Sequence, residues 1–205
     1  MTDKPGRRLV VGMTGATGTI FGVRLLQILE GTGIETHLVM SKWAARTLLH
    51  ETPYTMEEVQ QMATSHYQAQ DQGASISSGS FLTEGMIIAP CSVRTLGAIA
   101  GGMGDNLVHR AADVTLKERR RLVLMVREAP LSEIHLENML KLSRMGAVVL
   151  PPVPAFYNRP QTIDDMVNHT VQRALDQLGI HVDVVSRWDG VMAKGRNVSK
   201  AESER

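Results

Sequence analysis

The sequence predicts a three-layer α/β fold built on a doubly wound parallel sheet. Short apolar runs alternate along the chain with segments whose apolar residues recur at helical spacing. The chain has 205 residues, 43% hydrophobic and 21% charged, which fits one globular domain with a sizeable core. We therefore expect a single domain over residues 1–182. The polar residues 183–205 are expected to form a tail that is partly disordered or packs on a neighbouring subunit.

The first unit is an apolar strand that runs through a glycine-rich loop into an amphipathic helix. Residues 9–11 are apolar at consecutive positions, as in a strand covered on both faces. The helix is expected to begin soon after Gly18 and to continue to Leu29. Free amides and the macrodipole at a helix start favour an anion. We therefore expect a phosphate to lie against residues 14–19.

The loop glycines argue against a dinucleotide ligand. Gly12, Gly15 and Gly18 are spaced G-x-x-G-x-x-G rather than G-x-G-x-x-G, and no GK[ST] P-loop is present. The second predicted strand, residues 36–40, ends in Ser41 instead of the acidic residue that binds the ribose diol of NAD. A mononucleotide phosphate such as that of FMN therefore fits better than NAD.

The later elements follow in the same alternating order. We expect helices at residues 42–50 and 56–63, an irregular loop at 64–80, a strand at 85–89, a helix at 95–100 and glycines at 101–104. Helix 107–119, strand 122–126, helix 131–144, strand 147–150 and helix 162–178 complete the pattern. Helix 131–144 is apolar around too much of its circumference for one buried face, so a subunit interface is expected to cover the excess.

Polar residues follow the predicted strands at the sheet edge where ligands of open α/β sheets bind. They are Thr14, Gly15, Ala16 and Thr17 after the first strand, Ser41 after the second, Ser92, Val93, Arg94 and Thr95 after the third, Arg127 and Glu128 after the fourth, and the proline-rich residues 151–157 after the fifth. We expect these residues to outline one crevice. Ser92 and Thr95 could also be no more than helix caps.

Composition excludes several classes of function. A net charge of +1 and 4% aromatic residues give no reason to expect nucleic-acid binding. No apolar run approaches the about 18 residues of a membrane span, and no signal region is visible, so a cytoplasmic protein is expected. The single cysteine, Cys91, lies in an apolar context and is expected to be a buried small residue. The histidines show no metal-ligand spacing.

Seven motifs occur in the order in which one known family carries them. They are MTGATG, THLVMSK, ISSGSF, APCSVRTL, RAADVTLKERR, VREAPLSEIHLENML and PPVPAFYNRPQ. The likeness runs from about Leu9 to Leu178 and returns at Trp188. The chain resembles the flavin prenyltransferases, the UbiX-type flavoproteins of Rossmann-like fold. Within them it resembles the branch that is encoded beside hydroxyaryl and phenolic acid decarboxylases.

The resemblance implies an activity and a set of site residues. It implies a metal-independent enzyme that joins a dimethylallyl group from dimethylallyl phosphate to N5 and C6 of reduced FMN. The product, prenylated FMN, would serve a partner aromatic acid decarboxylase, and family members form homo-oligomers, commonly dodecamers. The implied FMN contacts are Gly15, Ala16, Thr17, Ser41, Ser92, Val93, Arg94, Thr95 and Arg127. The family often has Ser at position 17 and Lys at position 94.

The same motifs imply residues for the second substrate and for catalysis. Tyr157 and Arg173 are implied to hold the prenyl phosphate, with Arg110 and Lys117 near the same site, and Glu51, Lys117, Arg127 and Glu128 are implied to be catalytic. Cations and a hydroxyl suit the departing phosphate, and Glu128 beside Arg127 suits proton movement.

Two other functions stay open. One is an FMN-dependent decarboxylase of the related flavoprotein fold. The other is a non-catalytic flavin-binding accessory subunit of an aromatic acid decarboxylase. Trp188 is either a wall of the pocket or a plain packing residue.

Overall fold

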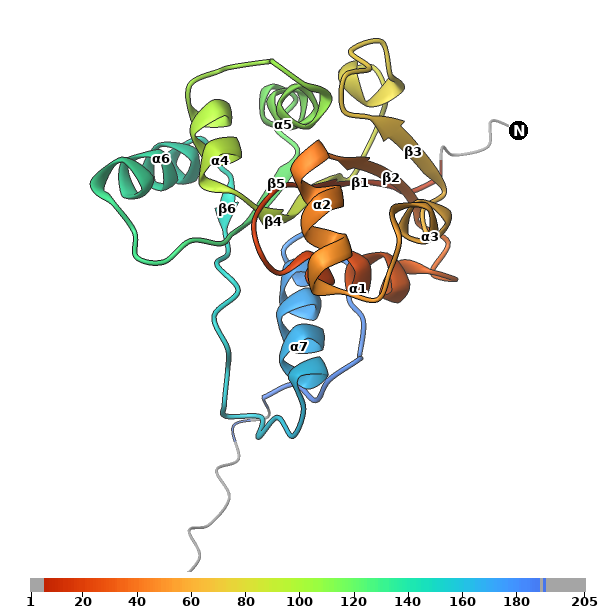
Figure 1. Cartoon of the computed structure of the whole chain (residues 1–205), viewed down its shortest axis with the longest axis vertical. Coiled ribbons are helices and arrows are strands. Elements are labelled where there is room, and N and C mark those ends of the chain that lie inside the picture. The colour runs from red at the N-terminus through yellow and green to blue at the C-terminus, as the bar shows by residue number, and fades with distance from the viewer. Residues whose placement is uncertain (1–5, 189, 191–205) are drawn as a thin grey trace, which may run out of the picture.

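A parallel sheet of six strands forms the centre of the computed structural model, which describes residues 6–188 and residue 190 (Figure 1). The strands are β1 (Arg8–Met13), β2 (Glu35–Met40), β3 (Ser65–Gln68), β4 (Gly85–Cys91), β5 (Arg121–Val126) and β6 (Val148–Val149). Their order is β3-β2-β1-β4-β5-β6, and every neighbouring pair is parallel. The chain reverses its direction of progress across the sheet between β1 and β4. A crevice is therefore expected at the carboxyl ends of these two strands.

Helices cover both faces of the sheet and make the fold three-layered, as the sequence predicts. They are α1 (Thr19–Leu29), α2 (Lys42–Glu51), α3 (Met56–Gln61), α4 (Val93–Ala100), α5 (Leu107–Lys117), α6 (Glu133–Arg144) and α7 (Ile163–Asp176), with a short 3₁₀ turn, η1 (Ser75–Ser77). Figure 1 shows α1, α3 and α7 on one side of the sheet and α4, α5 and α6 on the other. Within the described residues, no helix is both long and apolar enough to cross a membrane.

Alternation along the central strands builds two separate cores. In β1, Leu9, Val11 and Met13 pack into the core under α1 and α7, whereas Val10 packs into the core under α4 and α5. Both sets are buried, so the strand is apolar at consecutive positions.

Residues 64–80 were expected to be an irregular loop, and this prediction is wrong in part. Residues Ser65–Gln68 form β3, which pairs in parallel with β2 at the edge of the sheet, and η1 follows. The strand reads SHYQ and alternates between half-buried and exposed positions. An edge strand of this kind needs no apolar run, and for this reason its sequence resembles a loop.

The helix and strand ends differ from the predicted ones by a few residues. The sixth helix begins at Glu133 because Ser132 is its N-cap, and β6 is reduced to Val148–Val149. Helix α6 leaves Ile134, Leu136 and Leu140 more than half exposed, as its excess of apolar residues predicts.

The described part of the tail packs on its own chain. The backbone N–H groups of Val184 and Val185 donate to Oε1 of Gln172 on α7, at 2.9 and 3.0 Å. Residues 189 and 191–205 lie outside the described residues, so the expectation for the rest of the tail stays a prediction.

A buried histidine joins the first strands of the sheet. His37 Nδ1 lies 2.9 Å from the hydroxyl of Tyr67 on β3, and the ring of Phe81 meets the imidazole edge to face at 5.0 Å. Burial lowers the pKa of His37 below its ordinary value, and Glu35, 3.9 Å away, opposes this only in part. The folded state therefore favours the neutral form of His37.

Stability is expected to fall with acidification because of His37. Its contribution is complete above pH 6.5, the ordinary histidine pKa, and is lost as the pH falls below it, because the unfolded chain then takes up a proton that the folded one resists. Urea unfolding at about pH 7.5 and about pH 5.5 measures the effect. His37→Gln should reduce the difference between the two pH values, and the exposed His66→Gln on β3 should keep it. Equal differences in both variants would contradict the assignment.

Candidate active site

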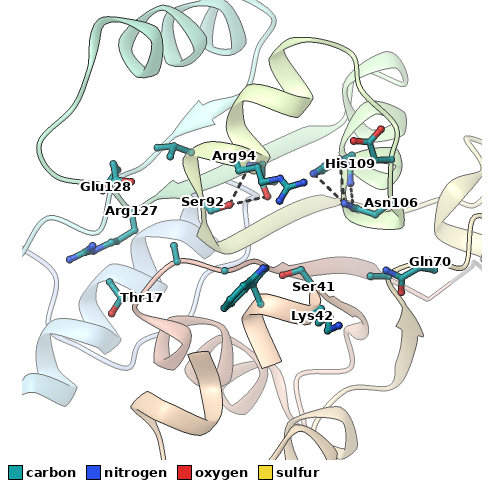
Figure 2. A pocket seen from close by; sticks show the side chains of 17 residues that line it. Thr17, Ser41, Lys42, Gln70, Ser92, Arg94, Asn106, His109, Arg127 and Glu128 are labelled. Carbon is teal, nitrogen blue, oxygen red and sulfur yellow. Dashed lines mark hydrogen bonds between the residues drawn. The ribbon is translucent and has the colours of Figure 1, made fainter. Parts of the chain in front are cut away.

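A cleft of about 700 Å³ opens at the carboxyl ends of the strands, where the strand order reverses. It is lined by Gly15, Ala16, Thr17, Ser41, Lys42, Trp43, Ala69, Gln70, Ser92, Val93, Arg94, Thr95, Asp105, Asn106, His109, Arg127 and Glu128. Figure 2 shows Thr17, Arg127 and Glu128 at one end and Gln70, Asn106 and His109 at the other. Its volume lies within the range of small-molecule and cofactor sites.

A buried threonine ties the two central strand ends together beneath the cleft. The hydroxyl of Thr14 donates to the Pro90 carbonyl at 2.9 Å and accepts from the Ser92 backbone N–H at 2.8 Å. The backbone N–H of Thr14 also donates to the Pro90 carbonyl, at 3.1 Å. Thr14 is 1% exposed, so these bonds are shielded from water. They hold the loops after β1 and β4 at a fixed separation.

Three helix N-termini line the cleft, those of α2, α4 and α5, and the first two are capped by serines. The side chain of Ser41 accepts from the Ala44 backbone at the start of α2, and that of Ser92 accepts from the Thr95 backbone at the start of α4. Each cap satisfies one of the four free N–H groups of its helix, so the remaining groups and the dipole still favour an anion. Arg94, in the first turn of α4, adds a positive charge on the same lining.

The N-terminus of α1 already has an anion from the protein itself. Glu51, the last residue of α2, accepts from the backbone N–H groups of Gly18 and Thr19, at 2.8 and 3.1 Å, and from the Thr19 hydroxyl. Burial opposes ionisation of Glu51, but these bonds and one from Thr17 outweigh it and lower the carboxyl pKa. The prediction that a phosphate lies at this helix start is therefore wrong for residues 18–19, because a carboxylate occupies their donors.

All nine predicted FMN contacts line the cleft, together with the predicted catalytic residue Glu128. Ser92 is both a helix cap and part of the lining, so the two interpretations of this residue hold together. The roles of these residues in binding and catalysis stay predictions.

Three other predicted residues do not line the cleft of their own chain. Arg110 of α5 donates to the Ser77 carbonyl and pairs with Asp113, and Lys117 pairs with Glu118 at the far end of the helix. The start of α5 lines the cleft at Asn106 and His109, so the helix places Lys117 on the order of 12 Å further along its axis. Glu51 caps α1 instead.

Tyr157 and Arg173 lie in a second pocket, which corrects the expectation of one crevice. This pocket of about 380 Å³ is lined by Tyr157, His169, Gln172, Arg173, Ser186, Arg187 and Trp188. The segment between β6 and α7 has no regular structure and runs along the far end of α7 (Figure 1). It therefore carries Tyr157 away from the carboxyl ends of the central strands.

Sequence reasoning missed several lining residues, above all Trp43. Trp43 is 59% exposed in the first turn of α2, and Arg46 lies over its ring at 5.0 Å. A Cβ on Gly15 would lie 2.4 Å from Cβ of Trp43, so the glycine lets the loop after β1 reach this tryptophan. A large aromatic residue shortly after the end of β2 was the available signal.

The far end of the cleft was also missed. Gln70, Asn106 and His109 lie there (Figure 2), and Lys42, Ala69 and Asp105 are further residues of the lining that the sequence did not single out. Burial lowers the pKa of His109, Asp105 opposes this, and Arg94 adds to it. Gln70 and Asp105 come from segments that the sequence identifies only as loop, so their approach to the site could not be predicted.

Cys91 is confirmed as a buried residue. Its thiol is free and fully buried, and burial raises its pKa to about 12. A thiol in this state is a poor nucleophile.

A family model, similar sequences and similar solved structures all match this chain over most of its length. The family model Flavoprotein matches residues 1–175. A probable UbiX-like flavin prenyltransferase of Bacillus subtilis (strain 168) is 61% identical over 184 residues, which cover 90% of each chain. The structure of AnUbiX (PadA1) in complex with FMN and dimethylallyl pyrophosphate matches with a TM-score of 0.90 and 50% identity, over 91% of this chain and 100% of that one. The dodecameric FMN-dependent UbiX-like decarboxylase of Escherichia coli O157:H7 matches with a TM-score of 0.87 and 58% identity, over 89% and 100%.

Proposed function

Because the chain belongs to the Flavoprotein family and, within it, to the UbiX-like flavin prenyltransferases, we propose that it transfers a dimethylallyl group from dimethylallyl phosphate to reduced FMN. The observation that carries this proposal is the cleft at the β1–β4 switch point, which gathers every residue implied to contact FMN. When bound there, reduced FMN supplies N5 and C6 as the atoms that accept the five-carbon unit.

The residues of the cleft fit FMN. A phosphate dianion suits the N-terminal turns of α2 and α4 together with Arg94, since all three favour negative charge. Thr17, Arg127 and Glu128 lie together at one end of the cleft, away from Ser41 and Arg94 (Figure 2), so we assign the flavin ring to that end. The threonine at position 17 keeps the hydroxyl of the usual family serine.

The charged residues would act on the departing phosphate and on a proton. The guanidinium of Arg127 stabilises the negative charge that develops on the phosphate as the allylic carbon–oxygen bond breaks. Glu128 exchanges a proton during ring closure, and its Oε1 accepts from the Ala129 backbone N–H at 3.0 Å, which orients the carboxylate. Tyr157, Arg173, Arg110 and Lys117 bind the prenyl phosphate, and Glu51 and Lys117 also take part in catalysis.

We propose that the protein is a homo-oligomer. The residues proposed to bind the prenyl phosphate do not line the cleft of the same chain, so a second copy would have to supply them; they are Tyr157, Arg173, Arg110 and Lys117. Assembly would bring α5 and α7 of one copy toward the cleft of another. The exposed Ile134, Leu136 and Leu140 of α6 provide an apolar face for such a contact, and the similar E. coli protein is dodecameric. We propose twelve copies because the similar E. coli protein has twelve.

The product is proposed to serve a partner enzyme in the cytoplasm. Prenylated FMN would pass to an aromatic acid decarboxylase of the hydroxyaryl or phenolic class. The single, unpaired Cys91 suits a reducing compartment.

Anaerobic incubation with reduced FMN and dimethylallyl phosphate, followed by mass measurement of the flavin, tests the activity. A mass gain of one prenyl unit supports the transferase, and an unchanged flavin mass would refute it. One similar structure is described as a decarboxylase, so the same preparation should also be tested on phenolic acids. Decarboxylation by this chain alone would favour the alternative of an FMN-dependent decarboxylase. Tight FMN binding without either reaction would favour an accessory subunit.

Trp43 is expected to contribute to FMN binding. Trp43→Ala should weaken FMN binding by about tenfold, because an exposed indole on the lining can stack on the ligand, and Trp43→Phe should retain most of the affinity. Calorimetric titration with FMN measures the change. Leu49→Ala, an exposed apolar truncation on the same helix outside the cleft, is the matched control. Equal affinities in Trp43→Ala and in the unmodified protein would exclude Trp43 from the site.

A further inference from the structure

A histidine holds the tyrosine of the second pocket. The hydroxyl of Tyr157 lies 2.8 Å from Nε2 of His169, and the two rings meet edge to face with their centroids 5.6 Å apart. Among the hydrogen bonds of the described residues, this is the only one made by the Tyr157 side chain. Both residues line the pocket of about 380 Å³ that also contains Arg173 and Arg187. The ring of Tyr157 also meets the ring of Trp188 edge to face at 5.7 Å, so both neighbours position the ring, and His169 is the one that contacts its hydroxyl among the described residues.

The two residues come from segments of different rigidity. Tyr157 belongs to a segment without regular structure and is 53% exposed. His169 lies inside α7, whose start is fixed by a capping box between Thr162 and Asp165. A helical residue can thus fix a hydroxyl that its own loop leaves free.

The same helix face carries the neighbouring cation. Arg173 lies four residues after His169, so both side chains lie on one face of α7. Asp176 accepts from Arg173 at 2.9 Å and from Arg187 at 2.9 and 3.0 Å, and this carboxylate holds both guanidinium groups at the pocket. The pocket therefore combines two guanidinium groups and a phenol, which can donate to a phosphate, with an imidazole that contacts the phenol.

The hydrogen-bond direction between His169 and Tyr157 decides what the phenol can do. If the hydroxyl donated to Nε2, its single proton would be used inside the protein and could not reach a ligand. If Nε2–H donates to the phenol oxygen, the hydroxyl proton stays free for a phosphate oxygen. Burial and the charge of Arg173 lower the pKa of His169, so one of its ring nitrogens lacks a proton and the tautomer matters.

We infer that His169 is a positioning residue whose Nε2–H donates to the oxygen of Tyr157 and directs the Tyr157 hydroxyl proton toward the phosphate of the prenyl donor. This inference rests on the proposed function of Tyr157 as a ligand of that phosphate. His169 itself does not contact the substrate.

Two substitutions at His169 separate its donor from its ring. His169→Phe keeps the edge-to-face packing and removes the donor, whereas His169→Gln keeps an N–H donor and removes the ring. With dimethylallyl phosphate as the varied substrate, His169→Phe should raise KM by about tenfold with kcat within about twofold, the loss of one oriented hydrogen bond to a charged ligand. His169→Gln should restore most of the affinity. His66→Phe on β3 is the matched control and should leave both constants unchanged.

A double-substitution cycle with Tyr157→Phe shows whether the effect passes through the phenol. His169→Phe should have no further effect on KM once Tyr157 is Phe. An equal rise of KM in both backgrounds would overturn the inference, and so would a fall in kcat at constant KM. If Tyr157→Phe raises KM and His169→Phe does not, only the inference about His169 is wrong. If Tyr157→Phe leaves KM unchanged, the proposed role of Tyr157 is wrong and the inference is wrong with it.

Discussion

Glu128→Gln is expected to lower kcat for the formation of prenylated FMN by about 10²–10⁴-fold. The amide has nearly the size of the carboxylate and can still accept a hydrogen bond from the Ala129 backbone, but it cannot exchange a proton. Glu128 lies on the cleft lining beside Arg127, at the end opposite Asn106 and His109 (Figure 2). FMN affinity should therefore change little. Anaerobic single-turnover kinetics and an FMN titration measure the two quantities separately.

The matched control for this substitution is Glu57→Gln. Glu57 is an exposed glutamate in the first turn of α3, and it does not line either pocket. Its loss should leave turnover unchanged. Normal turnover of Glu128→Gln would exclude the proton-transfer role, and loss of FMN binding would show that Glu128 acts in binding instead.

Thr14→Val is expected to lower the free energy of unfolding by about 3 kcal/mol. Valine has the shape of threonine, but it removes the hydroxyl that donates to the Pro90 carbonyl and accepts from the Ser92 N–H. The Ser92 N–H, which is partly shielded from water, then loses its partner, and this costs more than the bond itself. Because Ser92 starts α4 and lines the cleft, FMN affinity should fall as well. Urea unfolding with and without FMN measures both effects.

Thr115→Val provides a control of equal burial. The hydroxyl of Thr115 donates to the Ala111 carbonyl within α5, and the residue is 2% exposed. That carbonyl already serves the helix ladder, so the loss should stay below about 1 kcal/mol. Similar losses in the two variants would show that the bonds of Thr14 between the two loops stabilise the fold no more than a bond within one helix.

The sequence predicts most of the fold because most of its elements are strongly periodic. The stripe of α7 and the consecutive apolar residues of β1 each report which faces are covered. The missed element, β3, is polar and half exposed, and it is fixed by pairing with β2 rather than by its own pattern. Local periodicity carries no information on such an edge strand.

The sequence also predicts one part of the candidate site and misses another. Residues placed directly after a central strand, such as Thr17, Ser92 and Arg127, meet in the cleft, since the carboxyl ends of parallel strands share one edge. Tyr157 also follows a strand, but a long irregular segment carries it to α7 and a second pocket. The end of a strand thus places a residue that follows it closely, such as Arg127, but not one that a longer irregular segment separates from it, such as Tyr157.

By itself the sequence determined the α/β class, the strands whose ends build the cleft, many of the residues that line it and, through its motifs, the family. Only the tertiary structure showed that Glu51 takes the donors of α1, that Trp43 lies against Gly15, and that His169 holds Tyr157. The physical reason is that the spacing of apolar residues along a segment reflects which of its faces are buried. A hydrogen bond between side chains from different elements depends instead on how those elements pack, which no local pattern records.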